Sequence, residues 1–255
     1  MNLSLCTDIG DDYKSNSQRV RVITEHWIAS NMFCPRCGNE RLTHFANNRP
    51  VADFFCDNCN NQYELKSQHG LKLGRIADGA YSTMVKRIRS ADNPDFFFMS
   101  YSKKQWVVNN LFFVPKHFFT PSIIDKRPPL AMTAQRAGWI GCFINLTSIP
   151  SAGKIPIIEN GQLHPQKEIF NNIVRAEHLR VDDVNKRSWL LDVLACVDKI
   201  SGNEITLDEI YTFENYLAKL HPANHNVKAK IRQQLQMLRD KGIIEFTARG
   251  HYRKL

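Results

Sequence analysis

Two acids and a lysine lie close together in residues 49–67, which read RPVADFFCDNCNNQYELKS. Asp53 comes first, and Glu64 and Lys66 follow on what we expect to be the second strand of a β-hairpin. Asp53 and Glu64 can hold a hard cation such as Mg²⁺, with the backbone carbonyl of Leu65 as a further oxygen ligand. Because alternate residues of a strand share a face, Lys66 lies beside Glu64 and can orient or deprotonate a water molecule. These residues predict a metal-dependent phosphodiesterase site.

The spacing of Asp53, Glu64 and Lys66 is a weak signal when taken alone. An exposed strand with an ordinary Glu-Lys pair is the alternative, since such triplets also occur by chance. In the predicted site, the metal would stabilise charge on the transition state and lower the pKa of an attacking water molecule. Evidence for or against the predicted metal site must therefore come from the residues around it.

Four of the seven cysteines form two Cys-x-x-Cys pairs in the same part of the chain, at Cys34 and Cys37 and at Cys56 and Cys59. A two-residue spacer lets a tight turn direct both thiolates at one ion, and Gly38 suits such a turn. Two such pairs at this separation predict a four-cysteine zinc site. Because sulfur fills all four positions, the zinc would be structural. Two unrelated redox pairs, or cysteines that are simply buried, are the alternatives.

The composition places the chain among globular proteins that bind polyanions. Its 255 residues suffice for one large or two smaller domains, and 43% of them are hydrophobic. The net charge of +9 favours nucleic acid or an anionic membrane surface as the partner. We find no signal peptide, and no apolar run approaches the roughly 20 residues of a membrane span. We therefore expect a soluble protein of the cytoplasm.

Periodic hydrophobic patterns predict the elements around the acidic site. Residues 17–28 and 78–89 have helical periodicity, and the second helix presents Lys86, Arg87 and Arg89 outward. Two strands rich in Phe and Val follow at 96–101 and 105–114, with the character of buried sheet strands. Asn160-Gly161 is a strong hairpin signal. The basic helix face is either solvated or in contact with phosphates.

Residues 131–142, AMTAQRAGWIGC, have little helix or strand periodicity. They concentrate small residues around Arg136 and Trp139, as loops that approach a ligand do. A core tryptophan is the default interpretation. We nevertheless rank Trp139 as the aromatic residue of the first two-thirds of the chain that is best suited to contact a nucleic-acid base, with Arg136 beside it.

The last third of the chain has a different pattern. The polar run at 181–187 is the best candidate linker, which divides the chain into domains at 1–182 and 183–255. Three helices are expected at 189–200, 206–220 and 227–241, followed by a hairpin; Thr206 and Glu209 form a capping box, and Gly242 ends the third helix. Three helices followed by a hairpin with a basic tip are typical of a winged-helix domain.

The third helix and the hairpin carry much of the basic excess. Gln can bind adenine and Arg can bind guanine through two hydrogen bonds in the major groove. The alternative is a protein-binding winged helix with a solvated face. The predicted DNA-contacting side chains in this domain are Lys228, Arg232, Gln233, Gln236, Arg249 and Arg253.

The hairpin sequence RPVADFFCDNCNNQYELKS resembles the active-site hairpin of the PD-(D/E)XK nucleases. The whole chain resembles the DpnI-type methyl-directed restriction endonucleases, in the stretches YKSNSQ (13–18), CPRCGN (34–39), FANNRPVADF (45–54), RAGWIGC (136–142) and KIRQQLQMLRDKGIIEF (230–246). One departure from the superfamily pattern is that Pro50 precedes Asp53 by three positions instead of one. The expected fold class is therefore an α/β (α+β) PD-(D/E)XK core with an embedded four-cysteine zinc site, plus a C-terminal winged helix.

This resemblance implies a type II enzyme that cleaves double-stranded G-A-T-C sites whose adenine is methylated. It implies Mg²⁺ at Asp53, Glu64 and Leu65, with Lys66 as the further catalytic residue, and no obligatory protein partner. Both domains would read the methylated site, with Trp139 as the apolar part of a methyl pocket and Gln233 or Gln236 as a polar part.

Two other functions compete with this one. A non-catalytic zinc-ribbon and winged-helix transcription regulator explains the charge but leaves Asp53, Glu64 and Lys66 as coincidence. A repair or junction-resolving nuclease of the same superfamily is the other alternative.

Overall fold

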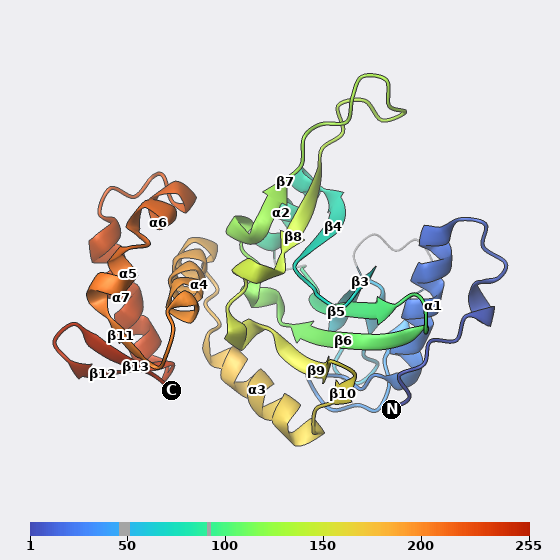
Figure 1. The fold of residues 1–255 in the computed structure, drawn as a ribbon, viewed down its shortest axis with the longest axis horizontal. Coiled ribbons are helices and arrows are strands. Elements are labelled where there is room, and N and C mark those ends of the chain that lie inside the picture. The colour runs from blue at the N-terminus through green and yellow to red at the C-terminus, as the bar shows by residue number, and fades with distance from the viewer. Residues whose placement is uncertain (46–51, 91–92) are drawn as a thin grey trace.

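The fold is described from a computed structural model, which places residues 1–45, 52–90 and 93–255. Arg49, Pro50 and Val51 of the predicted hairpin lie outside the described residues. The chain forms a larger α/β part and a smaller C-terminal part (Figure 1). None of the helices in the described ranges has the length and apolar character needed to cross a membrane.

A seven-stranded sheet forms the centre of the first part, in the order β1-β2-β3-β5-β6-β9-β10. Only β3 and β5 run parallel among these pairs, and the others are antiparallel. Every residue of β5 except Ser102 is buried, as expected for a continuous apolar run. The strands are Thr43–His44, Phe54–Phe55, Gln62–His69, Asp95–Ser102, Val107–Val114, Ile155–Glu159 and Gln162–Leu163.

The predicted strands and hairpins of this sheet are confirmed. Residues 96–101 and 105–114 correspond to β5 and β6, and the Asn160-Gly161 turn joins β9 to β10. Asn160 and Gly161 have φ values of 50° and 75°, the left-handed conformation that a tight two-residue hairpin requires. Short 3-10 turns occur at Asp8–Gly10, Lys116–Phe118, Pro121–Ile123, Leu146–Ser148 and Ser151–Gly153.

Two helices pack on this sheet. Helix α1 (Asn16–Asn31) confirms the helix predicted at 17–28 and buries Ile23, Trp27 and Ile28. Helix α3 (Gln166–His178) lies next to β9 (Figure 1). α1 thereby places one polar face beside the strands that carry the predicted acidic site.

A second, three-stranded sheet has the order β4-β8-β7, with bounds Arg75–Ala80, Gly141–Asn145 and Ile124–Lys126. The helix predicted at 78–89 is wrong at its start, because α2 spans only Tyr81–Arg89. Asp78 instead lies in β4, where it pairs with Cys142 of β8. This long-range pairing outweighs the local helical pattern.

The loop between β7 and β8 projects well beyond the rest of the molecule (Figure 1). It contains Arg136 and Trp139, so the expected loop is confirmed and Trp139 is not a core residue. Cys142, at the end of the predicted loop, is the second residue of β8.

The C-terminal part consists of four helices and a three-stranded sheet ordered β11-β13-β12. The elements are α4 (Val184–Lys199), β11 (Glu204–Thr206), α5 (Leu207–Tyr211), α6 (Glu214–Leu220), α7 (Val227–Asp240), β12 (Ile244–Ala248) and β13 (His251–Lys254). The predicted Thr206–Glu209 capping box is present, and Gly242 has a φ of 69°. The predicted winged helix is confirmed in its helices and wing.

Two boundaries in this part differ from the prediction. The helix expected at 206–220 is two helices, because Thr212 and Phe213 separate α5 from α6. The linker expected at 181–187 is shorter, since Asp183 already caps α4 through its side chain. α4 is largely buried because it packs on α7 and also contacts the 3-10 turn at Pro121–Ile123.

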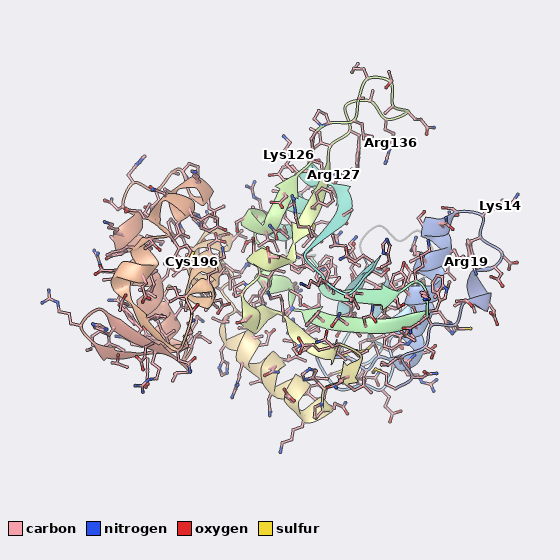
Figure 2. The ribbon with its side chains drawn as sticks, viewed as in Figure 1. Lys14, Arg19, Lys126, Arg127, Arg136 and Cys196 are labelled. Atoms are coloured by element: carbon pink, nitrogen blue, oxygen red, sulfur yellow. The ribbon has the colours of Figure 1, made fainter. Side chains whose placement is uncertain are left out.

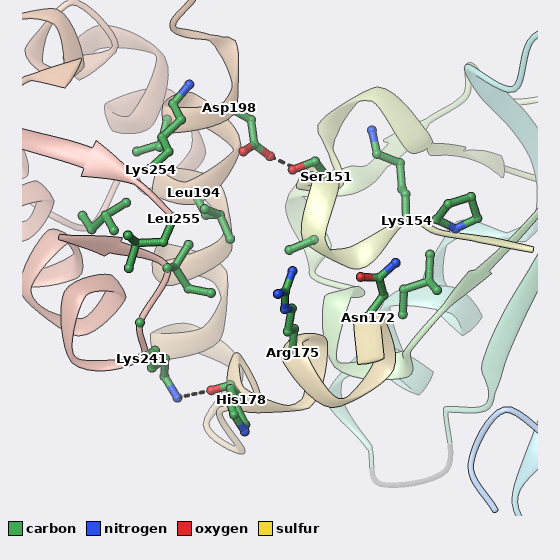
Figure 3. Close-up of a pocket in the computed structure, with 17 residues that line it drawn as sticks. Ser151, Lys154, Asn172, Arg175, His178, Leu194, Asp198, Lys241, Lys254 and Leu255 are labelled. Atoms are coloured by element: carbon green, nitrogen blue, oxygen red, sulfur yellow. Dashed lines mark hydrogen bonds between the residues drawn. The ribbon is translucent and has the colours of Figure 1, made fainter. Parts of the chain in front are cut away.

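A cavity of about 500 Å³ lies between the two parts (Figure 3). Two hydrogen bonds bridge them there. The ammonium of Lys241 donates to the carbonyl of His178 at 2.6 Å, and the backbone N–H of Ser151 donates to Asp198 at 2.7 Å. The two parts are therefore in direct contact.

Candidate active site

Strand β3 carries the Glu-Leu-Lys run. The side chains of Glu64 and Lys66 lie on one face, with Lys66 Nζ 2.6 Å from Glu64 Oε1. Both side chains are mostly buried, with exposed fractions of 11% and 19%. The alternation of side chains along a strand therefore brings Glu64 and Lys66 together. They do not form the exposed Glu-Lys pair of an ordinary surface strand.

Asp53 is positioned by the hairpin that β2 and β3 form. Its backbone N–H donates to the carbonyl of Tyr63 at 2.9 Å, and its Oδ2 accepts from the backbone N–H of Leu65 at 2.8 Å. Asp53 thus lies across from the Glu64–Lys66 segment, as the sequence predicts.

The environment of Asp53 disfavours the ionised form of its carboxyl group. Burial raises the pKa of its carboxyl to about 6, and the charges of Glu25 and Glu64 act in the same direction. The hydrogen bond from Leu65 and the charge of Lys66 oppose this effect only in part. Carboxylates that are crowded and partly desolvated in this way are typical of functional sites.

Asp78 of β4 is a residue that the sequence analysis missed. Its carboxylate lies 2.5 Å from Lys66 Nζ, so Lys66 contacts two carboxylates at once. Burial acts to lower the pKa of Lys66, but the charges of Glu64 and Asp78 outweigh it and the pKa is raised. Burial likewise acts to raise the pKa of Asp78, and Lys66 outweighs that effect and lowers it. Lys66 is therefore held as an ammonium ion.

Arg87 of α2 also reaches this site, contrary to its predicted outward position. Its Nη2 lies 2.8 Å from Glu64 Oε2, and its side chain is only 17% exposed. Each oxygen of Glu64 thus faces a cationic side chain. The last turn of α2 is basic, as predicted, but this arginine points inward.

Glu25 on α1 is the further acid of the site. It is 7% exposed, and its two oxygens contact Arg21 Nε at 2.6 Å and His44 Nε2 at 2.8 Å. Arg21 in turn lies 3.8 Å from Asp53. The sequence offered a single signal for Glu25, an acid on a helix that precedes the hairpin.

The four cysteines come together as predicted. Their sulfur atoms all lie within 4.8 Å of one another, with Cys34 to Cys59 and Cys37 to Cys56 both at 3.6 Å. A tetrahedral zinc site with Zn–S bonds of about 2.3 Å has sulfur separations of about 3.8 Å. All four are free thiols. The cluster therefore fits a metal ion such as zinc.

Two similar turns present these sulfurs. Gly38 donates its N–H to the carbonyl of Cys34, and Asn60 donates to that of Cys56, at 2.9 and 2.8 Å. Both Gly38 and Asn60 have positive φ. The hydroxyl of Tyr63 lies 2.9 Å from the sulfur of Cys34, and Tyr63 directly precedes Glu64. The cysteine cluster is thus connected to the strand of the acidic site.

The predicted DNA-contacting residues of the winged helix are exposed. On α7, Arg232 donates to the hydroxyl of Tyr211 at 2.6 Å, and the ammonium of Lys228 lies 3.5 Å from a carboxylate oxygen of Glu214. Gln233 and Gln236 of the same helix face solvent. Arg249 lies at the tip of the wing.

Arg253 differs from this group. Its guanidinium contacts Glu204 at 2.6 Å and Glu245 at 2.8 Å, one on each strand that flanks β13. Its charge is therefore balanced within the sheet.

Arg136 and Trp139 lie together in the projecting loop. The guanidinium of Arg136 stacks 4.6 Å above the Trp139 ring. Lys126, Arg127 and Arg136 follow this loop, and Lys14 and Arg19 lie on the α1 side of the molecule (Figure 2). The structure therefore presents the two predicted residues as a pair in the loop, away from Glu64 of β3.

Two family models match the chain. Residues 1–182 match DpnI, described as the Dam-replacing family. Residues 185–254 match DpnI_C, described as the Dam-replacing HTH domain. These matches support a nuclease of the methylation-dependent restriction type with a DNA-binding helix-turn-helix domain. The chain belongs to the DpnI, or Dam-replacing, family.

Proposed function

We propose that this protein is a type II restriction endonuclease that cleaves double-stranded DNA at G-A-T-C sites containing methylated adenine. The observation that carries the proposal is the meeting of Asp53, Glu64 and Lys66 at the β2–β3 hairpin, in a chain that also has a winged helix. A transcription regulator has no use for this arrangement.

Mg²⁺ is the cation that this acidic site fits best. Asp53, Glu64 and the carbonyl of Leu65 offer an all-oxygen set, which Mg²⁺ prefers over sulfur or nitrogen ligands. Burial and the neighbouring acids raise the pKa of Asp53, which is consistent with a site that accepts a positive charge. When bound, the ion would supply Lewis-acid stabilisation of the phosphodiester transition state.

The remaining chemistry belongs to the side chains. Because Lys66 is held as an ammonium ion between Glu64 and Asp78, it donates hydrogen bonds to a water molecule or to the scissile phosphate. This favours an orienting and charge-stabilising role over proton abstraction. Asp78 acts as a positioning residue for Lys66, and Arg87 does the same for Glu64.

Recognition of the methylated base is assigned to both parts of the chain, which we delimit at 1–182 and 183–255. Trp139 and Arg136 would supply an apolar surface and a cation in the projecting loop. The winged helix would contribute the side chains of Lys228, Arg232, Gln233, Gln236, Arg249 and Arg253. Arg253 is the weakest candidate, because two glutamates already pair with it.

The proposed setting is the bacterial cytoplasm, with DNA as the partner and no obligatory protein subunit. A four-thiolate zinc site requires reduced cysteines, and all seven cysteines of the chain are thiols. Zinc would be structural, because four sulfurs leave no coordination position for a substrate.

Digestion of one plasmid with and without adenine methylation tests the proposal. We expect fragments only from the methylated plasmid, and only when Mg²⁺ is present. A mobility shift without cutting would support the regulator instead. Preferential cutting of branched over linear methylated DNA would support a repair or junction-resolving nuclease.

A further inference from the structure

A second cavity, of about 350 Å³, lies where the end of α2 meets the segment that enters α4. Its wall is strongly basic, and Asp182 is the one acid among the described residues that line it. The basic side chains that line it are Arg36, Arg89, Lys116, His117, Arg180 and Arg187. They come from four separate parts of the chain, so only the tertiary fold brings them together.

Part of this charge is already neutralised. Arg36 contacts the buried Asp95 at 2.7 Å and also pairs with Glu177. Arg180 lies 3.3 Å from Asp182. Lys116 and Arg89, by contrast, have no ion pair with any acid in the described ranges. Among the described residues, the cavity thus has these two cations without an ion pair.

Arg187 is the most unusual member. It is 8% exposed, and its guanidinium donates to the backbone carbonyls of Val181, Asp182 and Ile88 at 3.1–3.4 Å. Its Nε atom is buried without a partner, and no described carboxylate pairs with it. Burial lowers the pKa of this guanidinium although the charges of Asp182 and Asp183 oppose the effect, and an anion in the cavity would offset the cost of burying it.

Asn93 adds an independent observation. It is 5% exposed and lines the same cavity, yet neither its amide nitrogen nor its amide oxygen has a hydrogen-bond partner within residues 1–45, 52–90 and 93–255. Buried polar atoms are almost always paired, so such a residue calls for an explanation. An anion would accept hydrogen bonds from the amide nitrogen of Asn93 and from the Nε of Arg187.

We propose that this cavity binds a phosphate group between Asn93, Arg187 and the unpaired cations Arg89 and Lys116. Arginine-rich walls recognise phosphate oxygens through several directed N–H donors. The volume is at the lower end of the range for small-molecule sites, which suits a mononucleotide-sized ligand. The group could be a backbone phosphate of bound DNA or a free phosphorylated molecule. Because its residues come from both parts of the chain, the bound phosphate would tie the winged helix to the nuclease part.

The free-phosphate source is tested by calorimetry with inorganic phosphate and with a 5′-mononucleotide at constant ionic strength. The variant Arg89→Gln/Lys116→Gln removes two cations that have no described ion pair, so the fold should survive. Lys104→Gln is the control, since Lys104 is an exposed lysine in the turn between β5 and β6. We expect one phosphate per chain, with about tenfold weaker binding in the double variant and unchanged binding in the control.

The DNA source is tested by the salt dependence of duplex binding without added Mg²⁺. Each lost phosphate contact lowers the slope of log K against log salt by about one. A lower slope in the double variant, with no free-phosphate binding, assigns the cavity to the DNA backbone. Free-phosphate binding with an unchanged slope assigns it to a small molecule, and both effects together show that it accepts either.

The proposal is overturned if free phosphate does not bind and the slope is unchanged, or if Lys104→Gln has the same effects as the double variant. Neither assay requires cleavage. Failure of the proposed nuclease function would therefore be seen separately from failure of this site.

Discussion

The two candidate metal centres of this protein share the β2–β3 hairpin but differ in how their charges are arranged. In the cysteine cluster, four thiols from two similar turns face one another within 4.8 Å. In the acidic site, the carboxylates face cations, with Glu64 between Lys66 and Arg87. The first centre draws all its ligands from four cysteines, whereas the second depends on side chains from α1, β4 and α2.

This difference has a physical consequence. A metal in the cysteine cluster would be enclosed by four sulfurs and would hold the turns together, since metal binding and folding are coupled in such sites. A metal in the acidic site would compete with Arg87 for Glu64 and would leave positions for water and phosphate. We therefore expect the cysteine cluster to stabilise the fold and the acidic site to carry the reaction, and substitutions at Cys34, Asp53, Lys66 and Asp78 test this expectation.

The largest effect is expected from Cys34→Ser. Structural zinc sites contribute on the order of 10 kcal/mol of binding free energy, so loss of one ligand should lower the melting temperature by well over 10 °C and reduce bound zinc below one per chain. Calorimetry and metal analysis measure both. Cys142→Ser is the matched control, because Cys142 is also buried but lies outside the cluster. Equal losses in the two variants would contradict the structural role of the cluster.

The next largest effect is expected at the acids and the lysine. Asp53→Ala or Lys66→Ala should slow cleavage of methylated plasmid by at least about 10³-fold, because each removes a group that acts on the transition state. Duplex binding and the preference for methylated DNA should persist. Lys104→Ala is the control for loss of a lysine. Cleavage by either variant at a rate close to that of the wild type would mean that the site lies elsewhere.

A smaller effect is expected for Asp78→Asn. The amide keeps the shape but removes one of the two charges on Lys66, so we expect kcat to fall about tenfold with KM for DNA nearly unchanged. Single-turnover kinetics separate the two constants. Asp125→Asn is a suitable control, since Asp125 lies at the second sheet and pairs with Arg75. A change in KM alone would show that Asp78 acts on DNA binding instead of positioning Lys66.

The smallest effect is expected for Trp139→Ala, which lies outside both centres. We expect a loss of about 1–3 kcal/mol in discrimination between methylated and unmethylated sites, with zinc content and melting temperature unchanged. Paired binding assays on the two duplexes measure it. An unchanged preference would remove Trp139 from the proposed methyl pocket and leave Gln233 and Gln236 as the candidates.

Local sequence features determined a large part of this protein. A two-residue spacer sets the geometry of each cysteine turn, because the hydrogen bonds to Cys34 and Cys56 close within four residues. Thr206 and Glu209 determine a helix start in the same local way, and Asn160-Gly161 determines a hairpin. The strand alternation of Glu64 and Lys66 was likewise predictable, since it requires only the repeat of an extended chain.

The tertiary structure decided what surrounds those features. Asp78 joins Lys66 because β4 pairs with β8, which is more than 60 residues away in the chain, and that pairing overrides a helical pattern. Glu25 and Arg87 reach the site from α1 and α2, and the way these helices pack against the sheets cannot be read from a local sequence repeat. The cavity proposed to bind phosphate brings Asn93 and Arg187 together in the same way. Local spacing determines the residues that carry the chemistry, whereas long-range packing determines the charges around them.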